Sequence, residues 1–407
     1  MDKRVPEVRF KGFTDDWEQH EMKSLFQISS AARVHKGEWS KSGIRFLRSS
    51  DIIAKYKGTR SEKLFIPVDL YHNLIRKSGK TSIGDVLITG GGSVGIPYLV
   101  DNNDPIYFKD ADVLWLKNEN ELNGYFLYTY FLTPRFKKYI KKISHVGTIS
   151  HYTIEQVEKT PIMLPRKNEQ FYIGNILKEL DNCVTLYQQQ LSLYKKVKKS
   201  LLQTMFPKDR EKAPKVRFAD FHDDWEQHKL KRFLSIPANK KITVKSSKDL
   251  MTVKLNVGGI VSGGNRDTLS LGSTIYYERH SGQLIYGKQN FFNGSMAIIP
   301  KHMDGKATSG DVPTFDISND IDRNYLFDFI SRHDYWKSKE SLSNGTGSKR
   351  IHESTFLNFD IIVPPNFDEQ SHISKLYKLY DELIDIEESK LKETLNLRKY
   401  FLQKLFI

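Results

Sequence analysis

The residues that could support catalysis are few and lack partners. The stretch TGGGSVGIP, from Thr89 to Pro97, formally satisfies the pattern G-x-G-x-x-G through Gly90, Gly92 and Gly95. Dinucleotide binding requires a helix after this turn, because the helix N-terminus holds the pyrophosphate. Pro97 and the strand-like runs YLV and PIYFK follow instead. We therefore interpret the glycines as a plain hairpin turn or as a glycine-rich turn close to a bound partner.

Other catalytic signatures are incomplete in the same way. Glu388, Ser389 and Lys390 form an E-x-K, the end of a nuclease metal motif, but they lie in a helical pattern without an acidic partner on a strand. The segment VPPNF at Val363 is not the pattern of amino-methyltransferases, and there is neither a glycine fingerprint for S-adenosylmethionine nor a P-loop. His145 and His151 lie too far from a third ligand to indicate a metal site. We expect no catalytic residues, no cofactor and no metal.

Charge points to a polyanionic partner. Lys and Arg number 63 and Asp and Glu 49, which gives a net charge of +14 and a pI near 9.4. Such a balance favours nucleic acid or a membrane surface, although many basic proteins bind neither. A length of 407 residues with 12% aromatic residues and a mean hydropathy of -0.51 is typical of two or three folded domains.

Cysteine usage and hydropathy bear on the compartment. Cys183 stands alone, so neither a disulfide framework nor a cysteine zinc site is possible. The N-terminal MDKRVPEVRF has no apolar core of a signal peptide, and no window reaches the length of an apolar membrane span. We expect a cytoplasmic protein without contact to a membrane.

An internal repeat organises the chain. The stretch VRFKGFTDDWEQH from Val8 returns as VRFADFHDDWEQH from Val216, with ten of thirteen positions the same and a spacing of 208. NEQFYIGNILKEL from Asn168 and DEQSHISKLYKLY from Asp368 correspond at a spacing of 200, as do LLQTMFP and FLQKLFI from Leu201 and Phe401. Two similar frames therefore flank two inserts, the second about eight residues shorter.

The inserts themselves do not match each other. GIRFLRSSDI from Gly43 has no convincing counterpart in MTVKLNVGGI from Met251, but both alternate apolar and polar residues. Strand-like runs such as DVLIT and SMAIIP are separated by Gly, Asn and Asp turns, which predicts mixed α and β domains. Each insert then offers one aromatic helical stretch, from Asn123 and from Arg323, and Pro134 is expected to kink or split the first.

A long helical pattern follows each insert. In the first, an alternating spacing of four and three predicts a coiled-coil seam in which only Lys198 is polar. Its positions are Ile173, Leu177, Leu180, Val184, Tyr187, Leu191, Tyr194, Lys198, Leu201 and Met205. The second pattern, from Ile373 to Leu405, has three polar seam positions, Glu387, Thr394 and Arg398. This seam is expected to be looser or shifted in register.

The order of frames, inserts and helices constrains the shape. If the helices bury their seams on each other, they must be antiparallel, and the chain end near Ile407 must return to its beginning near Val8. The repeated frame would then join the end of a helix to the base of an insert, twice. Alternatively, it is only a stable plug around Trp17 and Trp225. A helix of about 36 residues is roughly 54 Å long, enough to hold two domains one duplex turn apart.

These repeated residues resemble one known family. The frames from Val8 and Val216, the segment FLRSSDI, the Gly-Thr pairs at Gly147 and Gly345 and the helices ending in LLQTMFP and FLQKLFI are together similar to specificity subunits of type I restriction–modification systems. The resemblance spans essentially the whole chain. It implies two target-recognition domains that read the halves of a split DNA sequence in the major groove, and two antiparallel helices that hold them apart. The polar positions Glu387, Thr394 and Arg398 depart from a tight seam.

The resemblance also implies partners and boundaries. The partners would be double-stranded DNA, two methyltransferase subunits bound through the helices, and the restriction translocase; the chain itself would carry no catalytic residues. The implied fold is α+β, with recognition domains at residues 1–165 and 208–365 and spacer helices at 166–207 and 366–407. A self-contained DNA-processing enzyme such as a nuclease remains an alternative, as does a scaffold that ignores DNA.

Candidate DNA contacts follow from side-chain chemistry. Phosphate contacts need Lys, Arg and hydroxyl groups, and base readout adds Asn and Gln, mostly on loops between strands. The candidates in the first insert are Arg33, Lys36, Arg45, Arg48, Lys80, Thr89, His145, Thr148, Ser150 and His151. Those in the second are Lys240, Lys241, Lys245, Lys254, Arg266, Lys288, Asn290, Ser343, Asn344, Lys349 and Arg350. Each residue could equally be an ordinary surface residue.

Two further lysine groups have alternative explanations. Arg135, Lys137, Lys138, Lys141 and Lys142 are either the solvated face of an amphipathic helix or phosphate contacts. Lys195, Lys196, Lys198 and Lys199 lie in the middle of a long helix and could face an acidic partner subunit.

Overall fold

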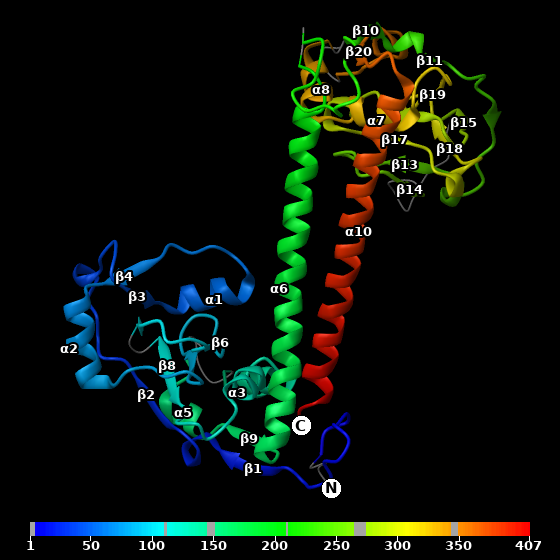
Figure 1. Cartoon of the computed structure of the whole chain (residues 1–407). Helices are drawn as coiled ribbons and strands as arrows, with labels where there is room; N and C mark the ends of the chain where they lie inside the picture. The colour runs from blue at the N-terminus through cyan, green and yellow to red at the C-terminus, as the bar shows by residue number, and fades with distance from the viewer. Residues whose placement is uncertain (1–4, 110–111, 145–150, 209–210, 264–273, 343–348) are drawn as a thin grey trace. The chain divides into compact units, whose positions relative to one another are not determined.

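The computed structural model describes residues 5–109, 112–144, 151–208, 211–263, 274–342 and 349–407 (Figure 1). It divides into two compact units, Met1–Gln189 with Glu388–Ile407, and Gln190–Glu387. The long helices α6 (Lys167–Thr204) and α10 (Phe367–Lys404) each contain 38 residues, and each contributes one part to either unit.

The insert of the first unit packs helices against two sheets. One sheet has the order β2 (Gln27–Ser30), β8 (Val113–Lys117), β5 (Val86–Thr89), β6 (Pro97–Leu99), and is antiparallel throughout. The other has the order β4 (Leu64–Ile66), β3 (Ile44–Leu47), β7 (Ile106–Phe108), with β3 and β7 parallel. The helices are α1 (Ser49–Lys57), α2 (Val68–Ser78), α3 (Gly124–Tyr130), α4 (Pro134–Ser144) and α5 (Ile154–Glu158).

The insert of the second unit repeats the first sheet with different surroundings. Its order is β11 (Leu234–Ser235), β19 (Thr314–Ile317), β16 (Leu284–Tyr286), β17 (Met296–Ile298). Beside it lie a sheet of β12 (Lys241–Ile242), β15 (Tyr276–Glu278), β18 (Ala307–Ser309) and a hairpin of β13 (Met251–Val253) and β14 (Ile260–Ser262). The helices are α7 (Arg323–Ile330), α8 (His333–Ser338) and α9 (Glu353–Leu357).

Short 3-10 turns complete both units. They span Met22–Ser24, Lys36–Glu38, Leu230–Arg232, Ser247–Asp249, Phe291–Asn293, Lys301–Met303 and Lys339–Leu342. The strand-like runs DVLIT and SMAIIP form β5 and β17, as the sequence predicts. β5 is buried along its whole length, because an apolar run in a central strand is covered on both faces.

The repeated frame has the same structure in each unit. Strand β1 (Glu18–Glu21) pairs with β9 (Pro161–Leu164), and β10 (Glu226–Lys229) pairs with β20 (Asp360–Val363) in the same antiparallel register. The Nε atoms of Arg9 and Arg217 each donate at 2.7 Å to a buried glutamate at the start of a long helix, Glu169 or Glu369. The guanidinium forks complete both pairs at 2.8 Å, so each frame is locked to its helix by a bidentate ion pair.

The same equivalence extends to the ends of the long helices. The Val8 amide donates to the Lys404 carbonyl at 3.1 Å in the first unit, and the Val216 amide donates to the Thr204 carbonyl at 3.0 Å in the second. Trp17 and Trp225 are buried, and their rings lie 6.5 Å from those of Phe406 and Phe206. The predicted return of the chain end to its beginning is confirmed. The frame is thus a socket for a helix end, and its tryptophans also form a buried plug.

The predicted seams are confirmed on both helices. Every predicted seam position of α6 and α10 is buried or half-buried. In the first unit Asp181 of α6 pairs with Arg398 of α10, and Tyr187 lies under Lys390, so the helices are antiparallel. In the second unit Lys198 pairs with Asp381. The polar positions Lys198 and Arg398 therefore belong to equivalent ion pairs, in which Asp181 provides the counter-charge of Arg398. The expectation of a looser or shifted second seam stays a prediction.

The aromatic helical stretch is split in both units. In the first, α3 ends at Tyr130 and α4 begins at Pro134, as predicted. Proline fits the first turn because its missing N–H has no partner there. In the second, α7 and α8 are separated without a proline, since Arg332 adopts an extended backbone (φ −61°, ψ 133°).

Candidate nucleic-acid interface

The glycine pattern of the first insert forms a hairpin turn. It joins β5 to the antiparallel β6, which agrees with the hairpin interpretation and removes the dinucleotide alternative. The Gly90 amide donates to the Asp112 carbonyl at 2.9 Å, and the Gly90 carbonyl accepts from the Tyr152 amide at 2.8 Å. The exposed His151 precedes Tyr152, and Lys109 forms an ion pair with Asp112. These polar groups gather at one end of the central strands β5 and β8.

Thr89 lies at this end but is a structural residue. Its side chain is 0% exposed, its hydroxyl donates to the Ser93 carbonyl at 2.6 Å, and the same oxygen accepts from the Ile96 amide at 2.9 Å. The predicted contact between Thr89 and DNA was wrong, because the hydroxyl group is buried and holds the turn closed.

Arg45 and Arg48 both form ion pairs with Asp51. The Nε of Arg48 lies 3.0 Å from an Asp51 oxygen and an Arg45 nitrogen lies 3.5 Å from the other. Burial alone would raise the pKa of Asp51, but the hydrogen bonds from Arg48 lower it below its ordinary value. The same hydrogen bond raises the pKa of Arg48. Both arginines anchor the start of α1, and a contact with DNA stays a prediction.

The other described candidates of the first insert are exposed but scattered. Arg33 follows β2, and Lys36 begins the 3-10 turn Lys36–Glu38. Lys80 follows Gly79, which lies against the side chains of Trp115 and Lys117. Lys117 lies at the end of β8 that is opposite to the glycine turn. The structure therefore does not bring Lys80 to that turn.

The second insert places charged residues where the first has glycine. Lys288 follows β16 as Gly90 follows β5: its amide donates to the Asp311 carbonyl and its carbonyl accepts from the Ile351 amide, both at 2.9 Å. The Lys288 ammonium lies 2.9 Å from Glu353, and Arg350 lies 3.1 Å from Asp311. Two predicted cations thus share one edge of the sheet with two carboxylates.

The strained turn between β13 and β14 is hydrogen-bonded to the turn that follows β16. The Asn256 amide donates to the Asn293 carbonyl at 2.8 Å, and the Val257 amide donates to the Gly294 carbonyl at 2.7 Å. These bonds bring the β13–β14 turn, with the exposed Lys254, to the turn that begins at Asn290. Asn256 and Val257 have φ values of +54° and +55°, and a β-branched residue is strained there.

The remaining described candidates lie elsewhere in the second insert. Lys240 pairs with Glu278 at 2.8 Å, Lys241 is exposed on β12, and Lys245 is exposed just before the turn Ser247–Asp249. Lys349 pairs with Glu340 at 3.1 Å. His145, Thr148, Ser150, Arg266, Ser343 and Asn344 lie outside the described residues, as do both Gly-Thr pairs.

Sequence reasoning missed several residues at these edges. The carboxylates Asp112, Asp311 and Glu353 were passed over because cations, amides and hydroxyl groups were sought; in the structure Asp112 directly precedes β8 and Glu353 begins α9. Lys55 and Tyr56, at the exposed end of α1, were also missed, as was Tyr98 on β6. The run KYK at the end of a helix is the signal that could have drawn attention to them.

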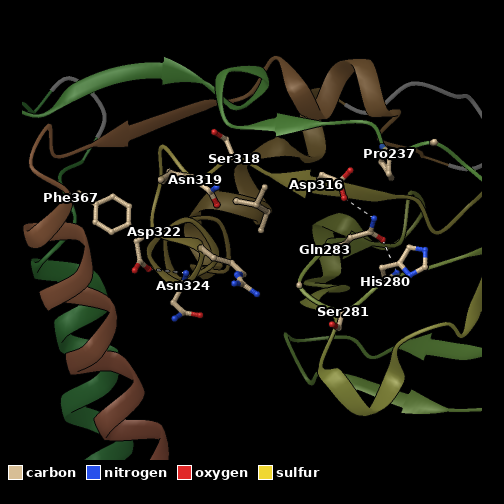
Figure 2. Close-up of a pocket in the computed structure, with 15 residues that line it drawn as sticks. Pro237, His280, Ser281, Gln283, Asp316, Ser318, Asn319, Asp322, Asn324 and Phe367 are labelled. Atoms are coloured by element: carbon tan, nitrogen blue, oxygen red, sulfur yellow. Dashed lines mark hydrogen bonds between the residues drawn. The ribbon is translucent and has the colours of Figure 1, made fainter.

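Figure 2 shows the residues that line a polar pocket in the second unit, at the start of α7. The pocket has a volume of about 950 Å³. Gln283 donates to Asp316 at 2.8 Å and accepts from the His280 amide at 3.0 Å, so these polar groups satisfy one another. In the first unit Gly124 begins the equivalent helix, and a side chain there would meet Gly84 at 2.6 Å. Arg323 replaces that glycine in the second unit. Among the described residues, no group of His, Cys, Asp and Glu is arranged to hold a metal ion.

Comparisons with known proteins agree with this architecture. The family model described as type I restriction modification DNA specificity domain matches residues 14–193 and 222–397. The chain belongs to this DNA specificity family. The two matched segments contain one insert each, so the internal repeat is a repeat of the family's domain. Membership favours a specificity subunit over the self-contained nuclease.

Similar members of the specificity family come from an archaeon. The specificity subunit of the type I restriction enzyme MjaVIII of Methanocaldococcus jannaschii is 25% identical over 64% of this chain and 64% of its own length. The chain thus spans less than two thirds of that relative. A protein described as the putative MjaX specificity subunit of the same organism is 24% identical over 92% of this chain and 88% of its own.

A solved structure supports the fold. The crystal structure of a type I restriction–modification S subunit from M. genitalium has a TM-score of 0.61 at 15% identity, and the match covers 99% of both chains. In the part of the chain that the structure describes, none of the helices has the length and apolarity to cross a membrane.

Proposed function

We propose that the chain is the sequence-specific DNA-binding subunit of a type I restriction–modification complex, and that each insert reads one half of a bipartite target in the major groove. The observation that carries the proposal is the duplication itself. One frame, with the same Arg–Glu lock and the same helix socket, is built twice around inserts whose edges carry different side chains. A reader of two unlike half-sites needs this combination, because only the reading surfaces must differ.

The recognition domains would be residues 1–165 and 208–365, with the helices at 166–207 and 366–407 as spacers. The DNA contacts would come from Arg33, Lys36, Lys80, His145, Thr148, Ser150 and His151, and from Lys240, Lys241, Lys245, Lys254, Arg266, Lys288, Asn290, Ser343, Asn344, Lys349 and Arg350, with Arg45 and Arg48 in supporting positions. The turns after β5 and β16 carry exposed residues, Gly92 and Ser93 in the first unit and Gln289 and Asn290 in the second. This exposure favours the assignment, since loops at strand ends are common carriers of base contacts.

The spacer helices would dock two methyltransferase subunits. Large apolar side chains remain exposed on them at a spacing of seven, Leu186 and Leu193 on α6, and Leu379 and Ile386 on α10. A heptad column outside the buried seam is typical of a further helix–helix contact. The restriction subunits would join this assembly, and the chain would contribute no catalytic residue.

Reconstitution tests this proposal. The purified chain is incubated with duplex DNA, Mg²⁺ and S-adenosylmethionine, alone and with the methyltransferase subunits. We expect methyl transfer only in the mixture, at one bipartite sequence that methylome sequencing of cells with and without the gene also reports. Cleavage or methylation by the chain alone would contradict the non-catalytic role, and a complete mixture that methylates DNA without sequence preference would contradict the reading role.

A further inference from the structure

A second basic surface of the first unit lies outside the glycine-turn edge. Its members are Lys55, Tyr56 and Lys57 at the end of α1, and Lys137 and Lys141 on one flank of α4; we call it the α1–α4 face. All five side chains are exposed. Phe136 is buried in the core and Ile140 packs against it, so α4 is anchored by its opposite side.

Two lysines of this region contact tyrosine side chains. The Lys137 ammonium donates to the Tyr56 hydroxyl at 3.1 Å and lies 5.7 Å from the ring centre, so it meets the hydroxyl edge of the ring. The Lys55 ammonium lies 4.2 Å from the centre of the Tyr98 ring. Each contact joins two elements, α4 with α1 and α1 with β6. A cation held by a hydroxyl group or on an aromatic face is already positioned, so less side-chain entropy is lost when an anion binds it.

The lysines of the face keep their charges available. Within the described residues, none of Lys55, Lys57, Lys137 and Lys141 forms an ion pair with a carboxylate, and α4 contains no acidic residue. The carboxylates of the neighbouring loop, Asp101 and Asp104, act on the Tyr98 phenol and help to raise its pKa, after burial. In the second unit, by contrast, Glu340 pairs with Lys337 and Lys349 near α8.

Ordinary structural roles account for only part of this arrangement. Lys55 and Lys57 in the last turn of α1 favourably face the negative end of the helix dipole. The lysines of α4 keep its outer side solvated. Neither role requires Lys137 to contact a tyrosine of another helix, nor brings unpaired lysines of two helices to one surface.

We propose that the α1–α4 face binds the phosphate backbone of duplex DNA and sets the position of the first insert on its half-site. The inference rests on the proposed function, because it assumes that the insert reads DNA. Unpaired, positioned lysines suit phosphate oxygens, which supply charge without sequence information. The face would therefore contribute affinity and register, while the strand-end edges supply base contacts.

The salt dependence of DNA binding tests the face directly. Affinity of the full chain for a mixed-sequence DNA duplex is measured over a range of salt concentrations, for the wild type and for K55Q/K137Q/K141Q. Each lost phosphate contact lowers the slope of log affinity against log salt by about 0.9, so the triple variant should lose about 2 to 3. Lys11→Gln, Lys63→Gln and Lys77→Gln together remove the same charge from exposed positions of the same unit, and this control should change the slope by less than one contact.

Tyr56→Ala separates positioning from charge. It removes the hydroxyl group that positions Lys137 but no cation, so affinity should fall about two- to fivefold at every salt concentration with an unchanged slope. A triple variant with the wild-type slope, or a control with an equal loss, would overturn the proposal. So would a triple variant that binds DNA normally but no longer binds methyltransferase subunits. If the wild type itself shows no salt-dependent binding to DNA, the result contradicts the proposed function of the chain and not only the role of the α1–α4 face.

Discussion

Single polar residues at the helix–insert junction differ between the two units. In the first, Tyr125 of α3 donates to Asp181, which also pairs with Arg398. In the second, Asp328 of α7 interacts electrostatically with both Lys198 and Asp381. Burial raises the pKa of Asp328 well above its ordinary value; Lys198 opposes this shift and Asp381 adds to it. In the first unit the single carboxylate, Asp181, has both a hydroxyl donor and an arginine. In the second unit two carboxyl groups, Asp328 and Asp381, share the charge of Lys198.

Asp328→Asn should change the pH dependence of stability. A carboxyl whose pKa is raised by folding stabilises the fold below its unfolded pKa, about 4, and that stabilisation is lost as the pH rises through the folded pKa. The variant cannot ionise at this position, so its melting temperature should exceed that of the wild type by more at neutral pH than at pH 4. Thermal unfolding of the full chain over this range measures the difference. A constant difference would show that Asp328 titrates normally.

Val257 carries backbone strain at the edge of the second insert. Its φ of +55° disfavours a β-branched side chain, whereas asparagine tolerates this region. Val257→Asn should stabilise the chain by about 1 kcal/mol. Val257→Thr keeps the branched shape and should give no gain, which makes it the matched control. Thermal unfolding compares the variants, and equal melting temperatures for Asn and Thr would rule out strain as the cause.

The long helices are elements whose alignment depends on a few charged pairs. Arg398 and Asp181 lie in a half-buried seam, where an ion pair of defined geometry selects one alignment over its neighbours. Lys198 and Asp381 do the same in the second unit. Because Asp181 and Asp381 are 200 residues apart, as are Lys198 and Arg398, both pairs follow from the repeat.

A double-mutant cycle should detect this coupling. Asp181→Asn, Arg398→Gln and the double variant are compared by chemical unfolding of the full chain, and the interaction energy should be about 1 to 3 kcal/mol. The exposed pair of Glu155 and Lys159 serves as the control and should show no measurable coupling. Equal coupling in both cycles would mean that the seam pair does not determine the alignment.

At the scale of the whole molecule, two inserts share one repeated framework. If the inserts read DNA separately, replacing residues 20–150 by the insert of another family member should change one half of the methylated sequence and leave the other intact. Methylome sequencing of cells that carry the exchanged gene measures both halves. Wild-type cells provide the reference sequence. A simultaneous change in both halves would show that the inserts do not read independently.

Much of the architecture can be predicted from the sequence, because the repeated segments and the helix seam are patterns of residue type and spacing along the chain. The 208- and 200-residue spacings predict two equivalent sockets, and the alternating spacing from Ile173 predicts one buried face along each helix. A period of 3.5 residues defines which side of a helix is buried without any knowledge of its partner. The hairpin at Gly90 and the split at Pro134 follow from equally local constraints on the backbone.

Contacts between distant segments were decided only by the tertiary structure. The hydroxyl group of Thr89 could bind DNA, but folding buries it. Lys137 has the sequence context of a solvated residue, but folding places it against Tyr56. The residue type states what a side chain can bind, whereas its exposure and its partners depend on which strands and helices pack beside it. The sequence by itself therefore determined the duplicated framework, and the packing of the inserts decided which of its polar residues remain available to a ligand.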